Sequence, residues 1–208
     1  MNIFFKILNI NWPLQILIVT TAFFGFLMLY SVSGGNWDPW TTPQIKRFTA
    51  AFFLIFFMAM INISFWKNMS PYAYILGIAL IIGVYFYGDT GMGAKRWLDL
   101  KFVKLQPSEA FKVSIVMFLA YYYDKLDPKY VSHPLYVSIP VILILIPSFL
   151  VFKQPDLGTA LVIVIIGISI MFLAGVHLGY FFVAGLSSIG LILLLFQSRG
   201  TSWQILKN

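Results

Sequence analysis

Long apolar segments recur along this chain, and they constrain its fold more than any other feature. A membrane-spanning helix needs roughly 20 apolar residues, with about 17 as a lower limit. Only 10% of the 208 residues are charged, against about 25% in an average soluble domain. The sequence therefore predicts one all-α, polytopic membrane bundle over residues 1–208. Its seven expected segments are residues 13–30, 48–65, 72–87, 107–123, 135–152, 157–176 and 180–196.

Two further patterns agree with a bilayer as the solvent of this chain. Tryptophan and tyrosine gather at the ends of the apolar segments, where amphipathic rings anchor helices at the interface. Pro140 and Pro147 lie inside the segment 135–152. They predict a kinked helix whose freed backbone groups are accommodated by neighbouring helices.

The largest polar interruption spans residues 88–106, and the helix start that follows extends it to residue 112. Such a concentration of charge, with glycines and Trp97, predicts a polar loop that forms a binding surface on one side of the membrane. Its glycines match no phosphate-binding loop. The charged residues of this stretch are Asp89, Lys95, Arg96, Asp99, Lys101, Lys104, Glu109 and Lys112.

The net charge of +7 favours anionic lipid headgroups as partners, and no nucleic-acid motif is present. Alternating the segments across the membrane puts four basic residues on the amino-terminal face and nine on the face of the 88–106 loop. The positive-inside rule alone would place the nine-charge face in the cytoplasm. The alternative is that these cations stay on the outer face because they bind an anion there.

Two helix starts echo each other: Gln106-Pro107-Ser108-Glu109 and Gln154-Pro155-Asp156-Leu157. Each is expected to place proline at the first helical position and a carboxylate in the first turn, where the helix dipole stabilises it. Glu109 and Lys112 lie three residues apart on one helix face. An unpaired ammonium at membrane depth costs at least about 2.5 kcal/mol, so we expect a buried, structural ion pair between them.

Asp156 admits two interpretations from sequence alone. It is a helix cap, or it is a general base or metal ligand beside Lys153 at the rim of the membrane. His133 and His177 fall on the opposite face without a third ligand, which argues against a zinc site. The absence of cysteine excludes disulfides and thiolate sites.

At these residues the sequence resembles a known family. The segments GAKRWLDL and QPSEAFK, followed after two membrane segments by KQPDLGTAL, are similar to the SEDS proteins, namely RodA, FtsW and SpoVE. The RodA branch is the most similar. The resemblance implies a bacterial inner-membrane protein with a cytoplasmic amino terminus and with the Trp97 loop on the periplasmic side.

The family's activity is the polymerisation of lipid II into peptidoglycan glycan strands for cell elongation and rod shape. By resemblance, Lys95, Arg96, Trp97 and Lys153 would bind the substrate, and Asp156 would be a catalytic carboxylate. A divalent cation would assist the leaving pyrophosphate. Expected partners are lipid II, a class B penicillin-binding protein, and rod-shape proteins such as MreC and MreD.

Family members have about ten membrane helices, and the aspartate regarded as essential lies in a loop beyond the equivalent of Asn208. The 208 residues alone are therefore expected to be inactive. Two other functions stay open at this point. The chain would serve as a flippase for the lipid-linked precursor, because intramembrane charges and kinked helices suit transport, or as a non-catalytic scaffold of the cell-wall machinery.

Overall fold

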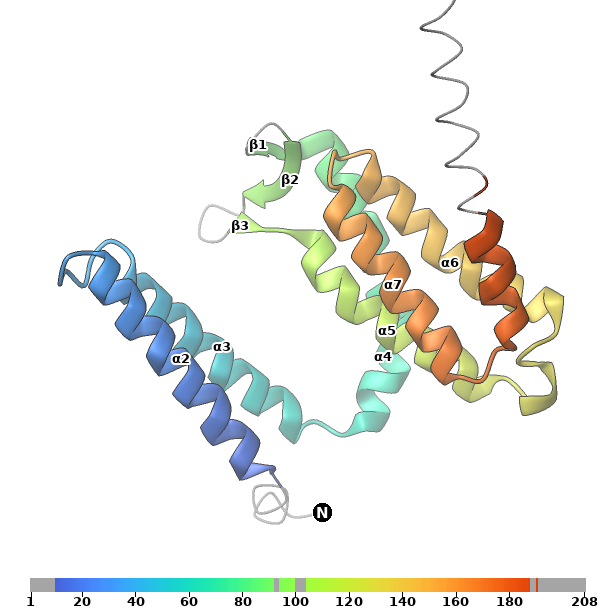
Figure 1. Cartoon of the computed structure of the whole chain (residues 1–208), viewed down its shortest axis with the longest axis horizontal. Helices are drawn as coiled ribbons and strands as arrows, with labels where there is room; N and C mark the ends of the chain where they lie inside the picture. Colours follow the sequence, from blue (N-terminus) through green and yellow to red (C-terminus); the bar gives the residue numbers. More distant parts are fainter. Residues whose placement is uncertain (1–9, 92–93, 100–103, 188–189, 191–208) are drawn as a thin grey trace, which may run out of the picture. The chain divides into compact units, whose positions relative to one another are not determined.

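The computed structural model describes residues 10–91, 94–99, 104–187 and 190, and it divides after Trp66 into two compact units (Figure 1). The first unit contains α2 (Trp12–Val32) and α3 (Thr41–Met60). The Asn11 side chain caps α2 by accepting a hydrogen bond from the Leu14 amide at 3.2 Å. Edge-to-face packing of Phe26 on Phe48 joins the two helices, with ring centroids 5.6 Å apart.

The second unit is a helical bundle with a small sheet at one end (Figure 1). Its helices are α4 (Ile63–Tyr87, beginning just before the division), α5 (Pro107–Lys125), α6 (Pro134–Phe152), α7 (Leu157–Leu173) and an apolar helix over Leu178–Ser187. A short 3-10 turn, η1 (Pro128–Tyr130), precedes α6. The buried core lies between these helices and includes Ile81, Phe111, Ile115, Leu119, Val151 and Ile163.

These helices confirm the all-α polytopic fold expected from the sequence, and each of the first six predicted segments coincides largely with a helix. The seventh, 180–196, overlaps the helix Leu178–Ser187, and most of the rest of it lies outside the described residues. Among the described residues, α2, α3, α4 and α6 are long and apolar enough to cross a membrane. Helix α5 contains Glu109 and Lys112 within its first two turns. Helix α7, with 17 residues, lies at the lower limit of length.

The boundary between the second and third segments differs from the prediction. Helix α3 ends at Met60, and α4 begins at Ile63 because the Asn62 side chain accepts a hydrogen bond from the Ser64 amide at 3.0 Å. Helix α4 then passes through Pro71, which lacks the N–H that would bond the Lys67 carbonyl. The Ser70 hydroxyl donates to that carbonyl at 2.8 Å, so the helix continues through Pro71, whereas the predicted segment began at residue 72.

Neighbouring helices accommodate the two internal prolines of α6, as predicted. Pro147 frees the carbonyl of Leu143, and the Tyr74 hydroxyl of α4 donates to it at 2.8 Å. Pro140 frees the carbonyl of Tyr136, and the Tyr122 hydroxyl of α5 donates to it at 2.8 Å. A freed carbonyl in an apolar environment is costly unless it is paired. These two tyrosines therefore satisfy backbone groups that the prolines leave open.

Close helix contacts depend on glycine at two positions of the core. A methyl group added at Gly77 of α4 would lie 2.5 Å from the ring of Phe111 in α5. One added at Gly167 of α7 would collide with the Ile144 side chain of α6. Small residues let helix backbones approach each other closely in membranes, so these glycines set the spacing of the bundle.

The polar stretch after α4 contains strands, which the sequence analysis did not predict. Strands β1 (Asp89–Gly91), β2 (Ala94–Asp99) and β3 (Lys104–Leu105) form an antiparallel sheet with β2 in the centre. Asp89 pairs with Trp97 and Leu98 pairs with Leu105. Figure 1 shows the sheet at the end of the bundle where α5 begins. The central strand therefore presents Arg96 to the helix ends.

Candidate functional site

One end of the second unit brings together most of the residues that the sequence analysis selected. Helices α4 and α6 end there, and α5 and α7 begin there. We call it the Arg96 end of the bundle. It comprises strand β2, the residue Gln106 before α5, and the turn of residues 153–156 between α6 and α7. All of these elements belong to the second unit.

Asp156 is the N-cap of α7, and hydrogen-bond donors surround its carboxylate. Its Oδ1 accepts from the Thr159 amide at 3.2 Å. Its Oδ2 accepts from the Thr159 hydroxyl at 2.9 Å and from the Gln106 side-chain amide at 3.4 Å. The side chain is 11% exposed. An N-cap carboxylate satisfies amides that the helix itself leaves unpaired, so capping accounts for the position of this group.

This cap also corrects one expectation about the second Gln-Pro start. Pro107 occupies the first turn of α5, as predicted. In the second motif, however, the helix begins at Leu157 with Asp156 as its cap, and Pro155 precedes the helix. The strong cap formed by the aspartate side chain, rather than the proline, determines where α7 starts.

Arg96 connects the sheet to the turn between α6 and α7. Its Nη2 donates to the Pro155 carbonyl oxygen in a short hydrogen bond. Its Nε lies 3.7 Å from Oδ2 of Asp156, within ion-pair range. That Nε is buried and has no hydrogen-bond partner among the residues that the structure describes. The side chain remains 32% exposed. The turn between α6 and α7 thus orients the guanidinium, which has five N–H donors in all.

The residues on either side of Arg96 were predicted to bind the same substrate. Successive side chains of a strand point to opposite faces, so Trp97 does not share the direction of Arg96. Trp97 is 37% exposed. Lys95 belongs to β2, but its side chain lies outside the described part of the chain. Arg96 is therefore the member of this predicted group whose contacts the structure defines.

Glu109 and Lys112 form an ion pair in the first turns of α5, with 2.7 Å between Lys112 Nζ and Glu109 Oε2. The pair is not buried, contrary to the expectation, because the Glu109 side chain is 54% exposed. Two helical residues three apart meet without help from the rest of the fold. The contact is thus local to α5, and its structural role stays a prediction.

Lys153 lies close to Asp156 in sequence but has a different environment. It is the C-cap residue of α6, its side chain is exposed, and its Nζ lies 5.2 Å from the centroid of the Phe149 ring. It lines a pocket between α4 and α6 that neither Arg96 nor Asp156 lines. The structure thus separates Lys153 from the Arg96–Asp156 contact.

Sequence reasoning overlooked three residues that position this site. Gln106 and Thr159 bond the Asp156 carboxylate, and the buried Gln154 donates to the Ile81 carbonyl of α4 at 2.8 Å. The repeated Gln-Pro pattern was the available signal. Its two glutamines have long-range partners: one ties α5 to α7, and the other ties the turn to α4.

The remaining metal and pocket candidates offer less chemistry. Among the described residues, no three His, Asp or Glu side chains lie close enough to hold a metal ion. His133 is the N-cap residue of α6, and His177 Nδ1 accepts from the Gly179 amide at 3.1 Å. Both lie at the other end of the second unit.

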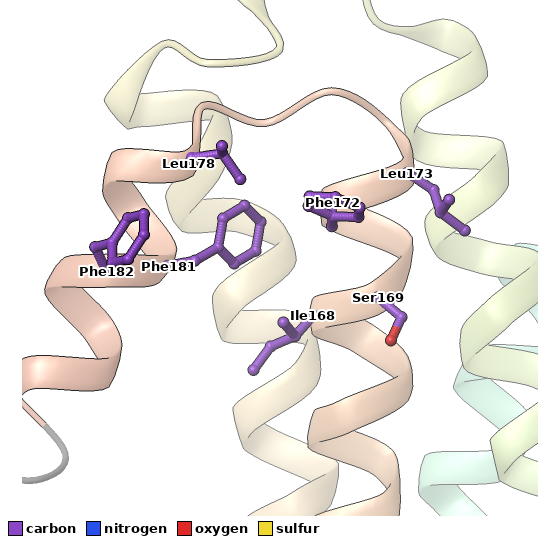
Figure 2. A pocket seen from close by; sticks show the side chains of 7 residues that line it. All are labelled: Ile168, Ser169, Phe172, Leu173, Leu178, Phe181 and Phe182. Carbon is purple, nitrogen blue, oxygen red and sulfur yellow. The ribbon is translucent and has the colours of Figure 1, made fainter.

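An apolar pocket of about 560 Å³ lies between α7 and the helix Leu178–Ser187. Figure 2 shows Phe172 and Phe181 facing each other across it, with ring centroids 6.1 Å apart. Its polar side chain, Ser169, donates to the Ile165 carbonyl of its own helix at 2.8 Å. This lining provides apolar contacts and no reactive group.

The helices and the charged cluster at one end define a multi-pass membrane protein. The chain belongs to the family of cell cycle proteins FtsW, RodA and SpoVE, whose family model matches residues 12–207. This finding confirms the resemblance carried by the motifs around Arg96 and Asp156.

Individual relatives agree with this assignment. The peptidoglycan glycosyltransferase MrdB of Escherichia coli is 28% identical over 173 residues, which cover 83% of this chain and 46% of MrdB. An FtsW protein of Buchnera aphidicola is 35% identical over 155 residues, which cover 73% of this chain and 39% of that protein. The chain thus spans about half the length of the curated relatives it matches.

Solved structures share the fold. A chain in a peptidoglycan synthase complex that coordinates polymerization and crosslinking matches with a TM-score of 0.75 and 24% identity, covering 88% of this chain and 53% of that one. The rod shape determining protein RodA of Thermus thermophilus matches with a TM-score of 0.70 and 22% identity, covering 88% of this chain and 59% of that one. At these identities the likeness establishes the fold.

Proposed function

We propose that this chain forms part of a peptidoglycan glycosyltransferase, in which the Arg96 end of the bundle holds the pyrophosphate of a lipid-linked sugar. The observation that carries the proposal is the position of the Arg96 guanidinium. The Pro155 carbonyl and Asp156 orient it, and about a third of the Arg96 side chain stays exposed. Family membership over residues 12–207 supports the reaction class. The proposed substrate is lipid II.

The proposed reaction joins two lipid-anchored saccharides. A sugar hydroxyl of one attacks the anomeric carbon of the other, and a new C–O bond forms as the bond to the pyrophosphate oxygen breaks. The hydroxyl proton passes to a carboxylate base, and undecaprenyl pyrophosphate leaves with the bonding electron pair. Arg96 would stabilise the charge on this leaving group, because a preorganised cation needs little rearrangement during the reaction.

Asp156 suits a positioning role in this scheme better than the role of base. Both of its oxygens accept hydrogen bonds from Thr159 or Gln106, and Oδ2 also lies 3.7 Å from Nε of Arg96, so neither oxygen is left open toward a substrate. It would hold the Arg96 guanidinium in place at the start of α7. The base would then come from the half of the family fold that this chain does not span.

The remaining assignments of the proposal rest on the family. Trp97 and Lys95 would contact the sugar or phosphate beside Arg96, on the extracytoplasmic face of the bacterial inner membrane, with a cytoplasmic amino terminus. A class B penicillin-binding protein would cross-link the strands, and MreC and MreD would act in the same machinery. A divalent cation would neutralise the pyrophosphate, but we assign no step to it because the described residues provide no cluster of three ligands.

The test is lipid II polymerisation in detergent by the purified chain alone and by a chimera that adds the part of MrdB outside the match. We expect glycan polymer from the chimera and none from the chain alone. Arg96→Ala in the chimera should lower turnover by about 100-fold, whereas Lys104→Ala, which removes an exposed cation of β3, should leave it unchanged.

Three outcomes would contradict the proposal. A folded chimera that forms no polymer but moves labelled lipid II across liposome membranes would identify a flippase. Equal turnover of the Arg96→Ala chimera and the unmodified chimera would remove Arg96 from the site. A folded chimera with neither activity would favour a scaffold.

A further inference from the structure

A groove between α4 and α6 has the shape and charge of a lipid site. Its volume is about 340 Å³, within the usual range for pockets that bind small molecules. Helix α4 provides one wall and the end of α6 the other, and Lys153 lies at the rim. The residues that line it are Ile81, Ile82, Tyr85, Phe86, Phe149, Leu150, Lys153 and Gln154.

The two walls of the groove are joined by polar contacts. The buried Gln154 side chain donates to the Ile81 carbonyl at 2.8 Å, close to Lys153. Further along the same pair of helices, the Tyr74 hydroxyl donates to the Leu143 carbonyl at 2.8 Å. Hydrogen bonds in an apolar environment resist opening, because a separated donor or acceptor finds no water there. These hydrogen bonds therefore fix the positions of the two helices that form the groove.

Its open side is apolar and faces outward. Tyr85, Phe86 and Phe149 are each more than half exposed although they belong to helices long and apolar enough to cross a membrane. A lipid that reaches these rings from the bilayer would therefore meet them with a hydrocarbon chain.

The positive charge of Lys153 at the rim of the groove favours a lipid with an anionic headgroup. Lys153 is the charged residue of the lining, and the described residues offer it no carboxylate within ion-pair distance. Its Nζ lies 5.2 Å from the Phe149 ring centroid, so a cation–π contact holds the ammonium over the apolar wall. The methylene groups of a lysine can lie along an apolar surface while its ammonium group stays at the membrane interface. There the ammonium can bind the phosphate of an anionic lipid.

We propose that this groove binds an anionic membrane phospholipid, with the phosphate on Lys153 and an acyl chain against Tyr85, Phe86 and Phe149. A phosphodiester with a single negative charge matches the single cation of the lining. The site lies apart from the Arg96–Asp156 contact, and it does not depend on glycosyltransferase activity. The bound lipid would hold the ends of α4 and α6 together.

Lipid-specific quenching tests the proposal in nanodiscs containing the full chain. Because the sequence has no cysteine, Tyr85→Cys can carry a single small fluorophore in the groove. Brominated phosphatidylglycerol and brominated phosphatidylcholine are then compared as quenchers at equal content. We expect phosphatidylglycerol to quench at about fivefold lower content, the ratio for one lysine near an anionic lipid.

Variants of Lys153 distinguish lipid binding in the groove from a general attraction of anionic lipids to a basic protein. Lys153→Gln should abolish the preference for phosphatidylglycerol, and Lys153→Arg should retain it. Lys104→Gln is the matched control, because it removes an exposed cation at the same end of the bundle that does not line the groove, and the preference should persist. Far-ultraviolet circular dichroism checks that each variant is folded.

Three results would overturn the proposal. The first is equal quenching by the two lipids in the unmodified groove. The second is a preference that survives in folded Lys153→Gln. The third is displacement of brominated phosphatidylglycerol by undecaprenyl phosphate at a one-to-one ratio to protein, which would assign the groove to the polyprenyl carrier instead.

Discussion

At the scale of single residues, the carboxylate of Asp156 is more constrained than its place in the sequence suggested. A free base needs an unoccupied oxygen that points toward a substrate, whereas both oxygens of Asp156 accept hydrogen bonds. The nearby Arg96 guanidinium adds a positive charge at 3.7 Å. The same contacts that make Asp156 a good cap therefore make it a good anchor for Arg96.

A double-mutant cycle tests this anchor. Arg96→Gln and Asp156→Asn should each reduce the free energy of unfolding in detergent, and the double variant should lose less than the sum. We expect a coupling energy of about 1 kcal/mol, within the range for partly exposed pairs and neighbouring groups. Unfolding by sodium dodecyl sulfate, followed by circular dichroism, measures it.

The control cycle pairs Asp156→Asn with Lys104→Gln, which changes the same charge outside the contact. It should be additive within about 0.5 kcal/mol. An Arg96–Asp156 cycle as additive as the control would mean that the contact contributes nothing to the fold.

At the scale of elements, side-chain hydroxyl groups allow α4 and α6 to continue through proline. Each of Pro71, Pro140 and Pro147 leaves a carbonyl without its helical donor. A hydroxyl takes that place in every case: from Ser70 in the same helix, or from tyrosines of α5 and α4. The prolines of α6 thus specify which side chains of neighbouring helices must face them.

Replacing Tyr74 by Phe should reveal this dependence. Loss of its hydroxyl leaves the Leu143 carbonyl unpaired, which should reduce the free energy of unfolding by about 0.6 to 1.7 kcal/mol, the range for hydrogen bonds between membrane helices. Tyr72→Phe, an exposed tyrosine of the same helix, should change it little.

The background Pro147→Ala provides a sharper comparison. Alanine restores the N–H that bonds the Leu143 carbonyl, so Tyr74→Phe should cost less in that background than in the natural sequence. An equal cost in both backgrounds would show that the Tyr74 hydroxyl does not substitute for the missing amide.

At the scale of the whole molecule, the second unit is polar at two ends that differ in character. At the Arg96 end, Asp156 lies in ion-pair range of Arg96 and Glu109 pairs with Lys112. The other end contains the ion pair Lys67–Asp124 between α4 and α5. The predicted excess of basic residues on the Arg96 face opposes the positive-inside rule, and the proposed function explains it by anion binding outside the cytoplasm.

Cysteine labelling decides this orientation. The chain has no cysteine of its own, so Lys104→Cys and Lys129→Cys each introduce a unique thiol at an exposed position, one at either end of the second unit. A membrane-impermeant maleimide should label residue 104 in intact spheroplasts and residue 129 only after permeabilisation. The reverse pattern would put Arg96 in the cytoplasm and remove it from any extracytoplasmic site.

Much of this architecture follows from local features of the sequence. The apolar runs predicted the helices, because burying 20 apolar residues in a bilayer outweighs most other preferences. The spacing of Glu109 and Lys112 predicted their ion pair, since residues three apart meet on any helix. The charge density of residues 88–106 identified the polar end of the bundle but not its strands, which are short and lack an alternating apolar pattern.

What only the tertiary structure decided is which distant groups meet. Arg96 and Asp156 are 60 positions apart in the chain, and Tyr74 and Leu143 are 69 apart. No local pattern relates them, because their contacts depend on how four helices pack around glycine and proline. The sequence by itself determined that this chain lies in a membrane and where its charges gather. Packing determined that the carboxylate of Asp156 orients Arg96 and that Lys153 faces a separate groove.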